Sequence, residues 1–142
     1  MNRSQILENR KTWIKKLKDP NSKKATERLE DLRVEGLCCL GHGCVALGLK
    51  RELLRDNSCV VLYGEEEEDM CAPSTFVKMV GLWNCVGAAV YGDLVFRGLK
   101  FHSLADINDS TDATPQEIGR YLESVIEGGD DSPFKPLSEY PE

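Results

Sequence analysis

The sequence predicts a small α+β fold in a single domain, with a small antiparallel sheet or hairpin packed against about four helices. Three observations indicate this class. Helical patterns with one apolar face lie near both ends of the chain, and short runs rich in β-branched residues lie between them. At 142 residues and 41% hydrophobic content, the chain also has the size and composition of a domain that buries its own core.

Residues 4–18 have the pattern of an amphipathic helix. The apolar face holds Ile6, Trp13, Ile14 and Leu17, with Leu7 at its edge. The cations that we expect elsewhere on this helix are Arg10, Lys11, Lys15, Lys16 and Lys18. Asn2 or Ser4 can cap its start, and Pro20 ends it. Residues 21–35 fit a short helix or a strand equally well.

Residues 36–49 form the most apolar stretch of the chain, and small residues are frequent in it. We expect a buried helix over 38–47 that packs closely against another element. Two internal glycines, Gly41 and Gly43, oppose this helix, because each costs about 1 kcal/mol relative to alanine.

Three shorter elements follow in the middle of the chain. Residues 58–63 cluster β-branched and aromatic side chains and predict a strand. Pro73 suits the first turn of a short helix with an apolar side. Residues 85–101 predict a hairpin whose turn lies at Gly92-Asp93, because apolar residues alternate before it and Leu94-Val95-Phe96 follows it.

The last helix is the best marked element. Thr114 supplies a hydroxyl cap, Pro115 stands at the first helical position, and Glu117 completes a capping box. We therefore expect the globular domain to cover residues 1–128. Residues 129–142 contain three prolines and no periodicity, which predicts a flexible acidic tail.

Charge is distributed unevenly along the chain. Residues 1–33 hold ten Lys or Arg and five Asp or Glu, whereas residues 34–142 hold eight and nineteen. The acidic bulk predicts that neither nucleic acid nor an anionic membrane is a partner. The basic part allows three interpretations: the solvated face of a helix, a surface for an anionic partner, or a contact between copies of the chain. The third interpretation would make the protein a homo-oligomer.

The apolar runs are too short to span a bilayer, and the first residues do not resemble a signal peptide. We therefore expect the protein in the cytoplasm, with its six cysteines reduced. Cys38, Cys39, His42 and Cys44 lie within seven residues and allow two interpretations, part of a zinc site or small buried apolar side chains. We favour the second, and we predict no metal and no cofactor.

Enzymatic chemistry has little support in the motifs. His42 and His102 are the two histidines that a cysteine nucleophile would need, and neither sits in a recognisable signature. No phosphate-binding P-loop is present, because Gly36 and Gly41 are not followed by the lysine that meets a phosphate. The acidic run 65–69 reads as a solvated loop, since its consecutive carboxylates do not wrap an ion.

One segment combines cations with nearby aromatic residues. The candidate ligand-binding residues are Trp83, Tyr91, Arg97, Lys100, His102, Asn108 and Asp109. Cations of this kind meet a phosphate and an aromatic ring stacks on a base, so an anionic small molecule is one interpretation. The other is that Asn108 and Asp109 only shape a turn while Arg97 and Lys100 are exposed strand residues.

Three segments stand out by their combination of residue types. They are the first helix with Trp13 and its basic continuation, Cys38-Cys39-Leu40-Gly41 followed by Cys44, and Ser103–Asp109 leading into Glu117-Ile118-Gly119. Together they resemble a family of uncharacterised small proteins of tailed bacteriophages and prophages, loosely over residues 5–127. His42 departs from that family, in which a bulky aliphatic residue is common here. The resemblance implies a phage-encoded accessory protein and supplies no catalytic residues.

These observations predict a protein that acts by binding rather than by catalysis. Our first hypothesis is an antagonist of a bacterial defence that sequesters a nucleotide-derived immune signal in the cytoplasm of the infected host. The alternative is a protein–protein inhibitor or DNA mimic directed at a host defence protein. A metal-stabilised module comes third, and an enzyme comes last because no acid–base pair stands out.

Overall fold

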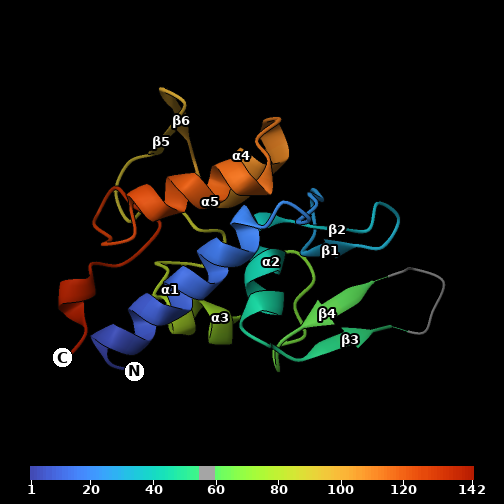
Figure 1. Ribbon diagram of the computed structural model, residues 1–142, viewed down its shortest axis with the longest axis horizontal. Coiled ribbons are helices and arrows are strands. Elements are labelled where there is room, and N and C mark those ends of the chain that lie inside the picture. Colours follow the sequence, from blue (N-terminus) through green and yellow to red (C-terminus); the bar gives the residue numbers. More distant parts are fainter. Residues whose placement is uncertain (55–59) are drawn as a thin grey trace.

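The structure, a computed structural model, describes residues 1–54 and 60–142 (Figure 1). Within these ranges the chain forms five α-helices, one 3-10 helix and three two-stranded antiparallel sheets, so the predicted α+β class is confirmed. Helices α1 and α5 lie side by side across the middle of the molecule, and the two ends of the chain lie close together (Figure 1).

The first helix, α1, covers Arg3–Lys18 and confirms the prediction within one residue. The side chain of Asn2 caps it and forms a capping box with Gln5. The apolar face is buried as expected, but the placement of one cation was wrong. Arg10 is fully buried on the same face, because its position fits the 3–4 spacing of the apolar residues.

Helix α2 covers Cys39–Ala46, which confirms the predicted buried helix. Its two glycines have a steric reason. A Cβ atom on Gly41 would lie 2.0 Å from the carbonyl oxygen of Leu29, and one on Gly43 would lie 2.4 Å from the Phe76 ring. The glycines therefore allow the close packing that the small residues predicted, and this packing outweighs their cost in the helix.

Helix α3 covers Ser74–Val80, and Pro73 stands just before it at the N-cap rather than inside the first turn. The helix buries Phe76 and ends at Gly81, whose φ of 69° is in the left-handed region that glycine adopts freely. Phe76 then contacts the core edge-on, with its ring centre 5.0 Å from that of Trp13 on α1.

The strands pair as three separate antiparallel ribbons and not as the single sheet that the sequence suggested. The pairs are β1 (Glu30–Asp31) with β2 (Gly36–Leu37), β3 (Arg51–Leu53) with β4 (Val61–Tyr63), and β5 (Leu94–Phe96) with β6 (Leu99–Phe101). The ambiguous segment 21–35 thus contains strand β1. Of the strand predicted over 58–63, residues 58 and 59 lie outside the described residues, and β4 confirms its end.

The predicted turn of the hairpin was wrong. Gly92-Asp93 precedes the hairpin, and the turn consists of Arg97 and Gly98, with φ values of 55° and 73°. Positive φ at both central residues is the type I′ geometry that matches the twist of the flanking strands. The loop before it is held by Asn84, whose side-chain oxygen accepts hydrogen bonds from the amides of Val86 and Ala88.

Helix α4 covers Leu104–Ser110, and the sequence had not predicted this helix. Its N-cap is Ser103, whose hydroxyl accepts a hydrogen bond from the amide of Asp106 at 3.1 Å. Helix α5 covers Pro115–Ser124 and confirms the predicted capping box. Asn108 and Asp109 therefore lie on a helix and not in a turn.

The predicted flexible tail is packed in the structure, which corrects the domain boundary at residue 128. Phe134 is fully buried and Leu137 is 6% exposed. A 3-10 helix covers Leu137–Glu139, and the amide of Arg3 donates to the carbonyl of Pro141 at 2.7 Å. Three prolines had hidden this packing, because they interrupt the helical or strand periodicity by which a buried segment is recognised.

The core centres on Trp13, which is fully buried. Its ring meets Phe134 edge-on at 5.9 Å, and its indole N–H donates to the carbonyl of Cys39 at 2.8 Å. Helix α1 thus contacts α2, α3, α5 and the C-terminal segment. None of the helices in the described part of the chain is both long and apolar enough to cross a bilayer.

Candidate functional site

The β5–β6 hairpin presents apolar side chains outward. Leu94 and Phe96 point into the molecule, and Phe96 meets the ring of Tyr121 on α5 edge-on at 5.6 Å. Val95 is 59% exposed and Leu99 is 63% exposed. The ribbon reaches beyond α5 at the upper edge of the view in Figure 1, so its outer residues are accessible to a partner.

We call the exposed side chains of Val95, Leu99 and Lys100 the hairpin surface. Val95 and Lys100 are directly opposite on the two strands, so they share one face of the ribbon. Leu99 is opposite Phe96 and therefore lies on the other face, directly after the turn, so the hairpin surface wraps around the edge of the ribbon. The loop that leads into the hairpin adds two more exposed apolar residues, Val90 at 41% and Tyr91 at 73%. Exposed apolar groups that gather in one segment are typical of an interaction site.

Arg97, predicted to meet an anionic ligand, forms two ion pairs with other residues of the chain at the protein surface. Its guanidinium lies 2.6 Å from a carboxylate oxygen of Asp112 and 2.5 Å from one of Glu117. Hydrogen bonds from Arg97 hold the pKa values of both carboxyl groups below their usual range. The side chain thus ties the turn of the hairpin to the start of α5, and its charge is already balanced.

Asn108 is a scaffold residue. It is 1% exposed, its side-chain amide donates to the carbonyl of Ala25 at 2.8 Å, and its oxygen accepts from the amide of Cys39 at 3.1 Å. The neighbouring Asp109 accepts from the amide of Glu27 at 3.1 Å. Together these hydrogen bonds hold α4 against the loop before β1. The side-chain amide and oxygen of Asn108 are therefore already used within the protein.

The aromatic members of the predicted set lie near the C-terminal segment. Trp83 is half-buried, and its indole N–H donates to the carbonyl of Gly129 at 3.2 Å. The backbone amide of Tyr91 donates to the backbone carbonyl of Asp130 at 3.3 Å. Lys100 and His102 are exposed. Of the seven predicted residues, Tyr91, Lys100 and His102 thus present accessible side chains without an internal partner among the described residues.

The cysteine cluster belongs to the core. Cys38, Cys39 and Cys44 are buried, and burial raises the pKa of each thiol, to about 11 for Cys38. The Cys39 thiol donates to the carbonyl of Leu104 at 3.7 Å. In the part of the chain that the structure describes, no three His, Cys, Asp or Glu side chains are placed to hold a metal ion.

His42 has its own polar contacts within this core. Its Nε2 lies 2.7 Å from the carbonyl oxygen of Lys23, which can only accept, so Nε2 carries the proton. Its Nδ1 then accepts a hydrogen bond from the ammonium of Lys16 at 2.9 Å. Burial, and then the charge of Lys16, lower the pKa of His42 to about 4. The ring is therefore neutral at pH 7.

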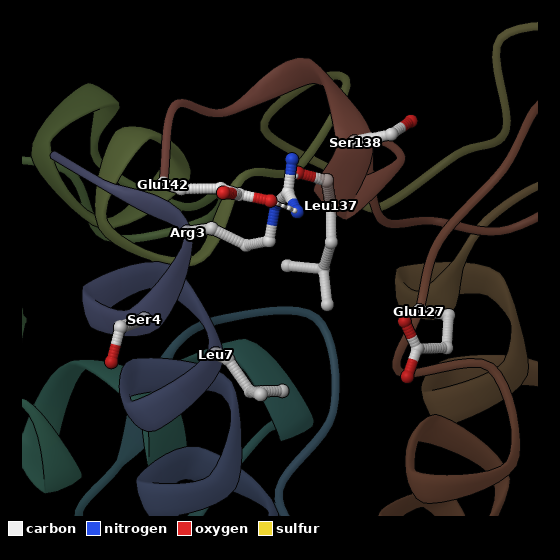
Figure 2. A pocket seen from close by; sticks show the side chains of 7 residues that line it. All are labelled: Arg3, Ser4, Leu7, Glu127, Leu137, Ser138 and Glu142. Atoms are coloured by element: carbon white, nitrogen blue, oxygen red, sulfur yellow. Dashed lines mark hydrogen bonds and ion pairs between the residues drawn. The ribbon is translucent and has the colours of Figure 1, made fainter.

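A groove of about 540 Å³ lies between the start of α1 and the C-terminal segment (Figure 2). It is lined by Arg3, Ser4, Leu7, Glu127, Leu137, Ser138 and Glu142. The guanidinium of Arg3 is directed toward Glu142 and the backbone of Leu137, with hydrogen bonds of 3.1 Å to each. The cation of Arg3 is thus engaged by the C-terminal segment, and these contacts join the two ends of the chain.

Comparison of the chain with protein-family models, with curated proteins and with solved structures finds no match in any of the three. The resemblance to small phage and prophage proteins therefore stays a prediction from the sequence.

Proposed function

We propose that this protein acts by binding another protein through the hairpin surface, without catalysing a reaction. The observation that carries the proposal is the exposure of Val95 and Leu99 at the end of a projecting ribbon. Removing such side chains from water contributes about 25 cal/mol per Å² of apolar area, which opposes the entropy cost of association. Tyrosine is one of the residue types that anchor interfaces when they enter a well-packed pocket of the partner, and Tyr91 is 73% exposed in the loop that leads into the hairpin.

The charge around the hairpin defines the partner further. Lys100 is exposed beside Val95, and no ion pair engages it among the described residues. Most of the remaining chain is acidic, since residues 34–142 carry nineteen Asp or Glu against eight Lys or Arg. A second copy of the chain would carry the same net charge of −6, so the two copies would repel each other. The surface thus fits a different protein with an apolar groove and a carboxylate at its edge.

The setting comes from the resemblance to phage proteins. A phage-encoded binding protein of this kind would inhibit a protein of the bacterial host, such as a component of its defence. Capture of a nucleotide signal, our first hypothesis from the sequence, has less support in the geometry. Arg97 and Asn108 serve internal contacts, and an anionic small molecule would be left with Tyr91, Lys100 and His102.

Matched surface variants test the proposal. We would compare Val95→Ser and Leu99→Ser with Val34→Ser and Met70→Ser, because Val34 and Met70 are 55% and 65% exposed and lie away from the hairpin in the sequence. Tagged proteins would be expressed in bacteria, and the captured proteins quantified by mass spectrometry. We expect one host protein to be lost from the hairpin variants and retained by the two control variants.

Folding and small-molecule binding are measured on the same samples. Equal urea midpoints for all variants would show that the loss is local. Native mass spectrometry of the unmodified protein would show a retained nucleotide as an added mass. A nucleotide adduct with no captured protein, or capture that the hairpin variants leave unchanged, would overturn the proposal.

A further inference from the structure

Two cysteines outside the core cluster lie next to each other, although 13 residues separate them in the sequence. Cys71 precedes α3 and Cys85 follows it. The amide of Ala72 donates to the carbonyl of Cys85 at 2.9 Å, which places the two backbone segments side by side. The Cys85 side chain is also near enough to contribute to the raised pKa of Cys71. The backbone contact brings the two cysteines together, and a disulfide forms only between cysteines whose backbones lie close to each other.

Accessibility separates this pair from the other described cysteines. Cys71 and Cys85 are partly exposed, whereas Cys38, Cys39 and Cys44 are buried. The Cys71 thiol also lies 3.6 Å from a carboxylate oxygen of Glu68. A small reagent can thus approach the pair without opening the core.

We propose that Cys71 and Cys85 form a reversible disulfide, a modification site that the fold prepares but leaves reduced. The oxidant we assign is a small-molecule disulfide such as oxidised glutathione. One thiolate of the pair attacks it, the S–S bond of the reagent breaks, and one small thiol leaves. The second cysteine of the pair attacks the mixed disulfide and releases the second small thiol. The protein loses two hydrogen atoms and the reagent becomes two thiols.

The bond would act on a defined part of the fold. It closes a loop that contains α3 and Gly81, whose carbonyl receives the side chain of Arg10. It also fixes the start of the loop that carries Val90 and Tyr91 beside the hairpin surface. Cross-linking two native neighbours constrains the unfolded chain more than the folded one. We therefore expect oxidation to raise resistance to urea.

Protonation controls how fast this reaction runs. Burial, together with the contact to Cys85 and the charge of Glu68, raises the pKa of Cys71 to about 12. Since the thiolate is the attacking form, we expect the pair to stay reduced at neutral pH for longer than an exposed thiol would. The rate of oxidation should rise as the pH increases.

The test uses the full chain with Cys59→Ser, because Cys59 lies outside the described residues. The reduced protein is incubated with excess oxidised glutathione at pH 7 and pH 9, and then analysed by intact mass and peptide mapping. We expect a loss of two hydrogen atoms, one peptide that links Cys71 to Cys85, a faster reaction at pH 9, and a higher urea midpoint. Addition of dithiothreitol should reverse all of these changes.

Single variants supply the controls. In Cys85→Ser the reaction should stop at one glutathione attached to Cys71, which traps the intermediate; Cys71→Ser should trap Cys85. Cys44→Ser should leave the linked peptide unchanged if it folds, and circular dichroism decides that. Glutathione on separate cysteines of the parent protein, links among other cysteines, or a urea midpoint that falls on oxidation would overturn the proposal.

Discussion

The guanidinium carbon of Arg10 lies 4.4 Å from the ring centre of Phe134, and both side chains are fully buried. The guanidinium also donates to the carbonyls of Val80 and Ile126 at 2.7 Å and of Lys135 at 2.9 Å. Burial lowers the pKa of Arg10 to about 10, so the group stays protonated at pH 7. One cation thus joins the ends of α3 and α5 to the C-terminal segment.

Replacing Arg10 should destabilise the protein strongly. In Arg10→Met the aliphatic volume is kept, but several buried carbonyls lose their donor, each at a cost of about 1–3 kcal/mol. We expect a loss of at least about 3 kcal/mol in the free energy of unfolding, measured with urea. Lys11→Met, on the exposed side of α1, should change it by less than about 0.5 kcal/mol. Equal losses in the two variants would contradict this role.

Phe134 tests whether the C-terminal segment is part of the packed domain. Phe134→Ala should cost about 3–5 kcal/mol, because it leaves a cavity beside Trp13 and removes the ring under Arg10. Limited proteolysis should then cut residues 129–142 much faster than in the parent protein. Ser138→Ala, at an exposed position, serves as the control. Unchanged stability in Phe134→Ala would return this segment to the flexible tail that the sequence predicted.

His42 should make stability depend on pH. Its pKa is about 4 in the folded protein and 6.5 as an ordinary value, so the unfolded chain binds a proton first as the pH falls. The free energy of unfolding should therefore decrease between pH 6.5 and pH 4, by about 3 kcal/mol in total, and be fully present above that window. Urea titrations across this range measure the slope.

The matched variant is His42→Gln, which keeps one donor and one acceptor for the contacts with Lys23 and Lys16. It should lose the His42 component of the slope while the carboxyl groups of the protein still titrate. If the two proteins show the same pH dependence, the imidazole is already protonated at pH 6, and the neutral Lys16–His42 contact is refuted.

Substitutions at Asn108 and Lys100 should have opposite effects, one on the stability of the fold and the other on binding of the partner. Asn108→Ala leaves the carbonyl of Ala25 and the amide of Cys39 unpaired, so we expect a loss of about 1–3 kcal/mol in stability. Lys100→Ala should leave stability unchanged and weaken capture of the partner. The opposite pattern, a stable Asn108→Ala protein that no longer binds, would restore Asn108 to the ligand-binding set.

The sequence anticipated the elements whose signals are local. The capping box at Thr114 and Glu117 and the apolar face around Trp13 were identified correctly, because hydrogen bonds and periodicity within one helix decide them. A similar local signal was missed at α4, where Ser103 and Asp106 stand at the spacing of a cap. The burial of Arg10 could also have been predicted, since this residue lies four positions after Ile6 on the buried face of the helix.

Long-range contacts explain what the sequence did not reveal. The side chain of Arg97 is held in the turn by Asp112 and Glu117, which are 15 and 20 residues away. Asn108 is occupied by the backbone of Ala25, 83 residues away. Neither partner is visible from residue type or spacing. The exposure of Leu99 likewise follows from where the turn lies, which the sequence misplaced.

The most direct test of the hairpin surface is site-specific photo-crosslinking in living bacteria. A photoreactive phenylalanine analogue would replace Val95 or Leu99, and Val34 or Met70 as exposed controls. After irradiation, we predict one covalent adduct with the same host protein from positions 95 and 99 and none from positions 34 and 70. Equal adducts from all four positions, or none from the hairpin, would contradict protein binding through this surface.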